Sequence, residues 1–287
     1  MSKPRTIEIC ALNISMHNPH SPQQYVDLLV EGRRKKKIFR QGEVHALMLG
    51  SLTGTKNAVE ANELRGEVYR FIKVDANEPW FNTQTNEQAS DDEVAALNIP
   101  LNLQAHMQRV EFVFYPREHE LWFVSRDGSN RLGPSRAERF FQLLLSDVAA
   151  SKDWPQVDVT VLPEKTALKN MFKLHQLNRI VMQFKRPNPD DGAEITRRIM
   201  HRMQAQKVQI VNEELIATKG HSIQPDDQTI AEAGVAARNG FVAVQGKDIE
   251  GLPVSESTVD KPMRVPMRVD SSIETAADVL LRARLML

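Results

Sequence analysis

Two short runs of alternating apolar residues lie on either side of a polar turn. Phe112 and Phe114 precede the turn at residues 116–119, and Leu121 and Phe123 follow it. Alternation with a period of two is typical of strands. A connection this short joins antiparallel neighbours, because parallel strands need a crossover of about a dozen residues or more. The sequence therefore predicts a β-hairpin within a mostly antiparallel sheet.

The rest of the first half adds strands and a capped helix. Residues 6–16 alternate, and their apolar positions change parity partway, which predicts a strand whose buried face switches through a β-bulge. Further strands are expected at 43–53 and 64–74. Ser21-Pro22 is typical of a helix N-terminus, and Gly32 is expected to end that helix.

A second helix is predicted from Pro134 to about Ala150. Proline suits the first turn, where its missing N–H would have no partner in the helix. The apolar residues recur at helical spacing and form one broad stripe for burial. They are Ala137, Phe140, Phe141, Leu144, Leu145 and Val148.

Beyond a linker at 151–155, predicted strands and helices alternate. The strands are expected near 157–161, 180–184, 208–210, 241–244 and 265–269, and the helices at 164–173, 193–206, 229–238 and 275–286. Asn239-Gly240 is expected to be a left-handed cap. The predicted class is α+β, with an antiparallel domain at 1–152 and a βαβ-type domain, of which the ferredoxin-like fold is one form, at 153–287.

Charge and cysteine content exclude several classes. The chain has 37 Lys and Arg against 37 Asp and Glu, so it is not a globally basic protein of the histone type. It contains no signal-peptide pattern and no apolar run of membrane-spanning length, so we expect a cytoplasmic protein without a membrane partner. The single cysteine, Cys10, excludes an internal disulfide and a Cys-rich zinc site, and we expect it to be buried.

No catalytic, cofactor or metal motif stands out. Residues 49–56 contain two glycines and a lysine, but the glycine spacing differs from that of a phosphate-binding loop. Asp190-Asp191 and Asp226-Asp227 lack the lysine that a nuclease motif needs and are expected to cap helices. The eight histidines are scattered and are expected in solvated loops. We therefore predict no catalytic residues, no metal and no cofactor.

Two basic runs are the candidate binding residues. The first has five consecutive cations, and the second lies on one face of the helix expected at 193–206. Each run has two interpretations, a solvated charged surface or a contact with a polyanion such as nucleic acid. The candidates are Arg33, Arg34, Lys35, Lys36, Lys37, Arg197, Arg198 and Arg202.

Trp80 and Phe81 interrupt a polar stretch that is rich in turn residues. Aromatic side chains in such a loop either pack onto the body of the fold or serve as anchors for a partner. We expect this pair to pack onto the body.

Three motifs carry a resemblance to a known family. They lie at 78–82, at 186–191 and at 237–242, and read Glu-Pro-Trp-Phe-Asn, Arg-Pro-Asn-Pro-Asp-Asp and Ala-Arg-Asn-Gly-Phe-Val. Along nearly its whole length the chain resembles a bacterial family of unknown function that occurs in prophages and mobile elements. Its layout is more loosely similar to phage exclusion proteins of the lambda Rex A type and to DNA-binding subunits of antiphage systems.

The basic runs and these similarities lead to three expectations of function. The first is a non-enzymatic, dimeric phage-exclusion protein that binds nucleic acid, DNA above RNA, with weak sequence specificity. A second is an interaction protein that recognises and inhibits a phage replication protein. A third is a metal-dependent nuclease toxin whose motif is cryptic.

Overall fold

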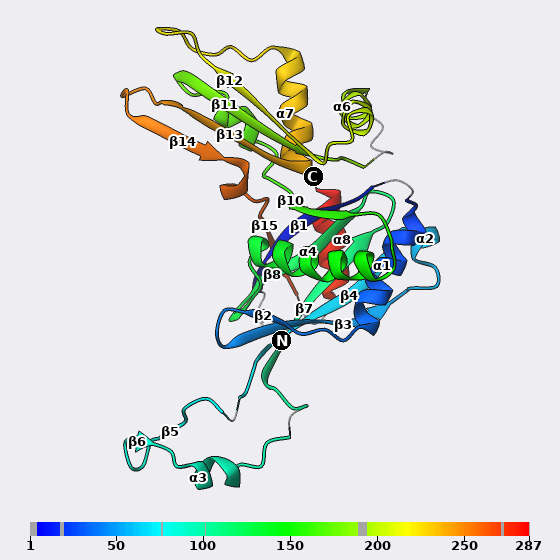
Figure 1. The fold of residues 1–287 in the computed structure, drawn as a ribbon, viewed down its shortest axis with the longest axis vertical. Helices are drawn as coiled ribbons and strands as arrows, with labels where there is room; N and C mark the ends of the chain where they lie inside the picture. Colours follow the sequence, from blue (N-terminus) through cyan, green and yellow to red (C-terminus); the bar gives the residue numbers. More distant parts are fainter. Residues whose placement is uncertain are drawn as a thin grey trace.

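A computed structural model describes residues 5–17, 20–75, 77–100, 102–188, 194–270 and 273–286. It shows an α+β chain with two antiparallel sheets and an extended arm (Figure 1). Within the described residues, no helix combines the length and the hydropathy that crossing a membrane requires.

The first sheet is large and curled. Its path is β10–β1–β8–β7–β4–β3–β2, and every pairing along it is antiparallel. The predicted hairpin is confirmed as β7 and β8, in which Phe112 lies opposite Phe123. The bounds are β1 Arg5–Met16, β2 Phe39–Gln41, β3 His45–Thr53, β4 Leu64–Ile72, β7 Ala105–Tyr115, β8 Glu120–Asp127 and β10 Val157–Val161, while the short β9, Asn130–Arg131, pairs with β8.

Strand β1 contributes side chains to a hydrophobic core on each of its two faces. Its register shifts between Glu8 and Ile9, which confirms the predicted bulge. Cys10 and Leu12 belong to one core cluster, and Ile9 and Ala11 belong to the other. A helix layer covers each face, so both sets of side chains are buried.

Three helices build these layers. α1 (Pro22–Arg34) and α4 (Pro134–Ser151) cover one face, and α8 (Ala276–Leu285) covers the other. All six residues of the predicted α4 stripe are buried. Ser21 caps α1 as predicted, but the helix continues past Gly32, which is buried with its Cα facing Leu144 of α4. α2 (Ala58–Ala61) is a single turn beside α1.

The second sheet has the order β12–β11–β13–β14. Helices α7 and α6 pack on it, with α7 against the strands and α6 against α7. The bounds are α5 Ala167–Met171, β11 Gln176–Lys185, α6 Glu194–Ala205, β12 Ile210–Ile216, α7 Asp227–Asn239, β13 Gly240–Lys247, β14 Pro253–Ser257 and the 3-10 turn η1 Thr258–Asp260.

The second half differs from the βαβ-type prediction. Parallel neighbours define a βαβ unit, whereas the pairings of the second sheet are antiparallel, and a ferredoxin-like fold is not shown. β10 and β15 (Val265–Val269) both pair with β1, so the chain returns to the first sheet after building the second. The expected left-handed cap is also wrong, because Gly240 has an extended φ of 174°. The division at 152/153 stays a prediction about folding units.

Residues 74–75, 77–100 and 102–104 form an arm that projects from the ends of β4 and β7 (Figure 1). It contains a two-stranded ribbon, β5 (Phe81–Asn82) and β6 (Glu87–Gln88), and the short helix α3 (Asp91–Ala96). None of its described residues is buried. The expectation that Phe81 packs onto the body is wrong, since its side chain is 63% exposed.

Candidate functional site

The basic run Arg33–Lys37 lies at the C-terminal end of α1, where acidic neighbours neutralise part of it. Nζ of Lys35 is 2.8 Å from one carboxylate oxygen of Asp147, and Nζ of Lys37 is 2.6 Å from the other. Hydrogen bonds from the two ammonium groups hold the pKa of Asp147 below its usual value. One α4 carboxylate therefore offsets much of the charge of two predicted binding residues.

A second carboxylate faces the same end of the helix. Glu31 forms an ion pair with Arg34 and lies 3.1 Å from Nζ of Lys152. These contacts lower the pKa of Glu31, with the hydrogen bond from Lys152 as the main cause. Among the described residues, no carboxylate lies within ion-pair distance of Arg33 or Lys36, which are the two exposed cations of the run left without such a partner.

The second predicted run lies on α6 and is neutralised in the same way. Arg198 lies 2.8 Å from Glu232, and Arg202 lies 2.6 Å from Glu213. Arg197 is exposed and makes no ion pair with a described residue. α6 packs against α7 of the second sheet, whereas α1 packs against α4 of the first, so separate layers carry the two runs (Figure 1).

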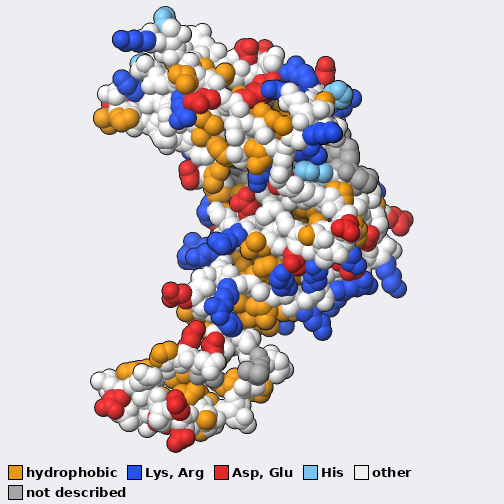
Figure 2. Space-filling model, viewed as in Figure 1, with side chains coloured by type: hydrophobic (Ala, Val, Ile, Leu, Met, Phe, Trp, Pro, Cys, Tyr) orange, Lys and Arg blue, Asp and Glu red, His pale blue; other side chains and the backbone are white. Residues whose placement is uncertain are grey.

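A different basic site, which was not predicted from the sequence, lies where α4 begins. Arg126, Arg131, Arg136 and Arg264 line a pocket with a volume of about 520 Å³, which we call the arginine pocket. Arg126, Arg131 and Arg136 are exposed, and no described carboxylate lies within ion-pair distance of them. Figure 2 shows Lys and Arg side chains gathered on the left flank of the main body.

The carboxylates of the arginine pocket leave it positive. Glu8 and Asp260 also line it, so four arginines face two carboxylates. Arg264 engages Glu8 at 2.7 Å. The other three guanidinium groups form no ion pair with either carboxylate of the pocket. The pocket therefore has an excess of positive charge.

The N-terminus of α4 adds to this positive field. Gly133 is its N-cap and provides no side-chain cap, Pro134 follows, and no acidic residue lies in the first turn. Gly133, Pro134 and Ser135 line the arginine pocket. The partial positive charge at the start of an 18-residue helix therefore points at the same space as the arginines.

The sequence did contain a signal for this site. Four arginines occur between 126 and 139, and they surround Pro134, which marks a helix start. The run is less conspicuous than five adjacent cations because turn residues separate the arginines. Whether carboxylates lie close to these arginines depends on the fold. Counting charged residues along the sequence therefore does not show that they lack ion-pair partners.

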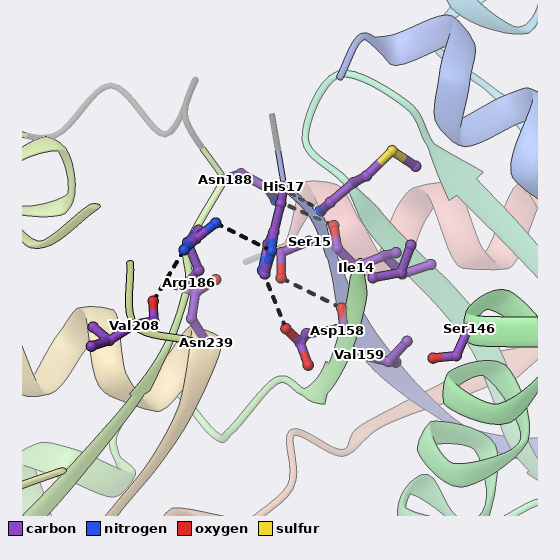
Figure 3. Close-up of polar contacts among 12 residues, drawn as sticks. Ile14, Ser15, His17, Ser146, Asp158, Val159, Arg186, Asn188, Val208 and Asn239 are labelled. Carbon is purple, nitrogen blue, oxygen red and sulfur yellow. Dashed lines mark hydrogen bonds and ion pairs between the residues drawn. The ribbon is translucent and has the colours of Figure 1, made fainter. Parts of the chain in front are cut away.

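A buried polar junction lies between the two sheets (Figure 3). His17 follows β1, Asp158 belongs to β10 and Arg186 follows β11. Nε2 of His17 lies 3.5 Å from Oδ2 of Asp158, and Nη1 of Arg186 lies 3.5 Å from Nδ1 of His17. If Arg186 donates to Nδ1, the ring proton lies on Nε2 and faces the carboxylate. Arg186 also donates to the Val208 carbonyl at 3.1 Å.

Amide and hydroxyl groups extend the junction. Tyr25 donates its hydroxyl proton to Oδ1 of Asn188 at 2.6 Å, and Nδ2 of Asn188 donates to the Ile14 carbonyl at 3.2 Å. Asn13 of β1 donates to Oδ1 of Asn239, the last residue of α7, at 3.0 Å. These contacts join the first sheet to the second, so we assign the junction a structural role.

The junction corrects the expectation that the histidines lie in solvated loops. His17 is 8% exposed and His119 is 1% exposed. Within the described ranges, no group of three or more His, Cys, Asp or Glu side chains is arranged to hold a metal ion.

The other sequence motifs have structural roles. Cys10 is buried as predicted, and burial raises the pKa of its thiol to about 11. Residues 49–56 are the end of β3 and a turn. Asp226 caps α7 by accepting from the Thr229 N–H at 2.7 Å, as predicted. Asp190 and Asp191 lie outside the described residues.

Sequence comparison places the chain in a family. No curated protein matches it. A family model described as a domain of unknown function, DUF4747, matches residues 5–284. The link to prophages and the likeness to Rex A stay predictions. Because the match spans nearly the whole chain, the protein belongs to the DUF4747 family.

Proposed function

We propose that the protein binds the phosphodiester backbone of nucleic acid at the arginine pocket. The observation that carries this proposal is the set of three exposed arginines, Arg126, Arg131 and Arg136, which have no carboxylate partner among the described residues and lie at a helix N-terminus without acidic residues. Guanidinium groups donate two parallel hydrogen bonds to phosphate oxygens, and a helix N-terminus favours anions.

Backbone contact also fits the low sequence specificity that we expect. Contacts to phosphate position a nucleic acid without reading its bases. The pocket lining contains no aromatic side chain on which a base could stack, so duplex DNA suits this site better than single strands.

The test is fluorescence anisotropy with a labelled DNA duplex over a salt series. Reversing two pocket charges, Arg131→Glu with Arg136→Glu, should weaken binding at least tenfold. It should also reduce the slope of log affinity against log salt by about 0.9 for each lost phosphate contact.

The matched control reverses two exposed cations of the sequence-predicted run, Arg33→Glu with Lys36→Glu. This control should bind DNA like the wild type. If the control loses binding and the pocket variant keeps it, the interface lies at Arg33–Lys37 instead. If the wild type binds neither duplex DNA nor RNA, the proposed function is wrong.

The phage-exclusion role stays part of this proposal, and plating efficiency tests it. Cells that express the wild type should lower phage plating, and the pocket variant should restore it. Capture of a phage replication protein that survives nuclease treatment would favour the interaction-protein alternative. Cleavage of nucleic acid that needs a divalent metal and is abolished by a single Asp or His substitution would favour the nuclease alternative.

A further inference from the structure

The arm carries negative charge only. Residues 74–104 contain six acidic side chains and no Lys or Arg in a chain with zero net charge. Figure 2 shows red and orange side chains on this lower lobe. The acidic residues are Asp75, Glu78, Glu87, Asp91, Asp92 and Glu93.

The arm also exposes large apolar side chains to solvent. Phe81 is 63% exposed, Leu97 is 49% exposed and Leu103 is 57% exposed. None of the described residues of the arm is buried, so the ribbon and α3 have no core of their own. A two-stranded ribbon and a helix of 6 residues are marginal alone, and exposed apolar clusters are typical of interaction surfaces.

The main body has a groove with complementary chemistry. Its volume is about 190 Å³, and Phe39, Phe140 and Leu143 are among its lining residues. The Phe39 and Phe140 rings meet edge to face at 5.5 Å, and Leu143 is 47% exposed. We call it the β2–α4 groove.

Arginines surround the apolar part of the β2–α4 groove. Arg40, Arg136 and Arg139 line it, all three are exposed, and none has a described carboxylate within ion-pair distance. No acidic side chain lines the groove. The groove thus offers an apolar surface beside three cations, while the arm offers apolar side chains among six carboxylates.

We propose that the acidic arm of one molecule docks in the β2–α4 groove of a second copy of this chain. The arm of each molecule projects away from its own body (Figure 1), so it presents Phe81 and Leu97 to another molecule. A two-fold axis would place each arm in the other molecule's groove, which closes the assembly at two copies. Opposite charges would set the register, and apolar burial would supply most of the affinity.

The test measures the mass of the full-length chain by sedimentation over a range of concentrations without nucleic acid. The wild type should be a dimer that dissociates as salt rises. The arm variant, Asp91→Lys with Asp92→Lys, should weaken dimerisation at least tenfold. The groove variant, Arg40→Glu with Arg139→Glu, should do the same, while the Arg33→Glu, Lys36→Glu control should dimerise like the wild type.

Mixing the two variants gives the sharpest result. In the mixture, the reversed arm meets the reversed groove, and the unchanged arm meets the unchanged groove. The heterodimer should therefore form with affinity close to that of the wild type, although each variant alone is monomeric. Its recovery also shows that both variants are folded.

Three outcomes would overturn the proposal: a monomeric wild type, a dimer that neither variant weakens, or a mixture that stays monomeric. A monomeric wild type whose arm binds a basic protein would assign the arm to another partner. These measurements contain no nucleic acid, so they succeed or fail independently of the proposed function.

Discussion

His17 and Asp158 face each other where β1 ends and β10 begins, with Nε2 of the imidazole 3.5 Å from Oδ2 of the carboxylate. Both side chains are buried, with Asp158 7% exposed, and they lie at neighbouring strands of the first sheet. Removing the carboxylate leaves the buried imidazole without the acidic group that its Nε2 faces. Asp158→Ala should therefore lower the free energy of unfolding by about 1–3 kcal/mol.

Denaturant unfolding followed by circular dichroism measures this loss. The matched control is Glu43→Ala, which removes an exposed carboxylate that has no ion-pair partner among the described residues and should change stability by less than about 0.5 kcal/mol. Equal stability of Asp158→Ala and the wild type would show that the contact between Asp158 and His17 contributes nothing to the free energy of unfolding.

Gly240 lies where α7 passes directly into β13, close to the backbone of β11. A Cβ atom at Gly240 would lie 2.0 Å from the Gln183 carbonyl oxygen, whereas one at Gly234 would have no neighbour within 4 Å. Gly240→Ala should therefore destabilise the protein by about 1–3 kcal/mol through overpacking. Gly234→Ala, inside α7, should stabilise it by up to about 1 kcal/mol.

The same pair of substitutions separates sterics from helix propensity. Thermal unfolding of both variants should show shifts of opposite sign. A neutral Gly240→Ala would mean that β11 and β13 move apart at little cost.

The sequence predicted local elements well because their signals are local. The alternation around Phe112 and Phe123, the proline at the start of α4 and the serine cap of α1 each depend on neighbouring residues, and all are confirmed. β1 was also predicted with its bulge. Helix layers cover both faces of β1, so apolar side chains on both faces are buried. The change of parity in the sequence therefore does not require the strand to switch its buried face.

Long-range relationships could not be predicted in this way. Asp147 is 112 residues from Lys35, and it approaches that lysine only because α1 packs against α4. The basic run Arg33–Lys37 therefore offers a ligand less free positive charge than its sequence indicates. The pairing of β15 with β1 connects the two ends of the chain, and no local pattern specifies that partner.

The Cys10 thiol should be unreactive in the folded protein. It is fully buried, and burial raises its pKa from 9.0 to about 11. Ellman's reagent at pH 8 should label the chain only after denaturant unfolds it. Immediate labelling of the native protein would contradict burial of this strand.

The same pKa shift predicts how stability depends on pH. Because the neutral thiol is favoured in the folded state, its contribution is complete below pH 9 and is lost as pH rises from 9 towards 11. Cys10→Ala should remove this component of alkaline destabilisation. Unfolding curves of both proteins between pH 8 and 11 measure the difference.

Arg136 lines both the arginine pocket and the β2–α4 groove, so it belongs to both proposals. A phosphate and the acidic arm of a second copy would compete for this side chain and for the positive field around it. We therefore expect DNA binding and dimerisation to oppose each other, and linkage requires the effect to be reciprocal. Added duplex DNA should shift the wild type towards monomer in sedimentation.

The arm variant supplies the reverse measurement, because Asp91→Lys with Asp92→Lys removes the competing arm and leaves the arginine pocket unchanged. At protein concentrations where the wild type is dimeric, this variant should bind DNA several-fold more tightly. At concentrations where both proteins are monomeric, the two added lysines should have only a small effect, since the arm then lies away from the pocket. Equal DNA affinity of the two proteins under dimeric conditions would show that the arm and the nucleic acid occupy separate surfaces.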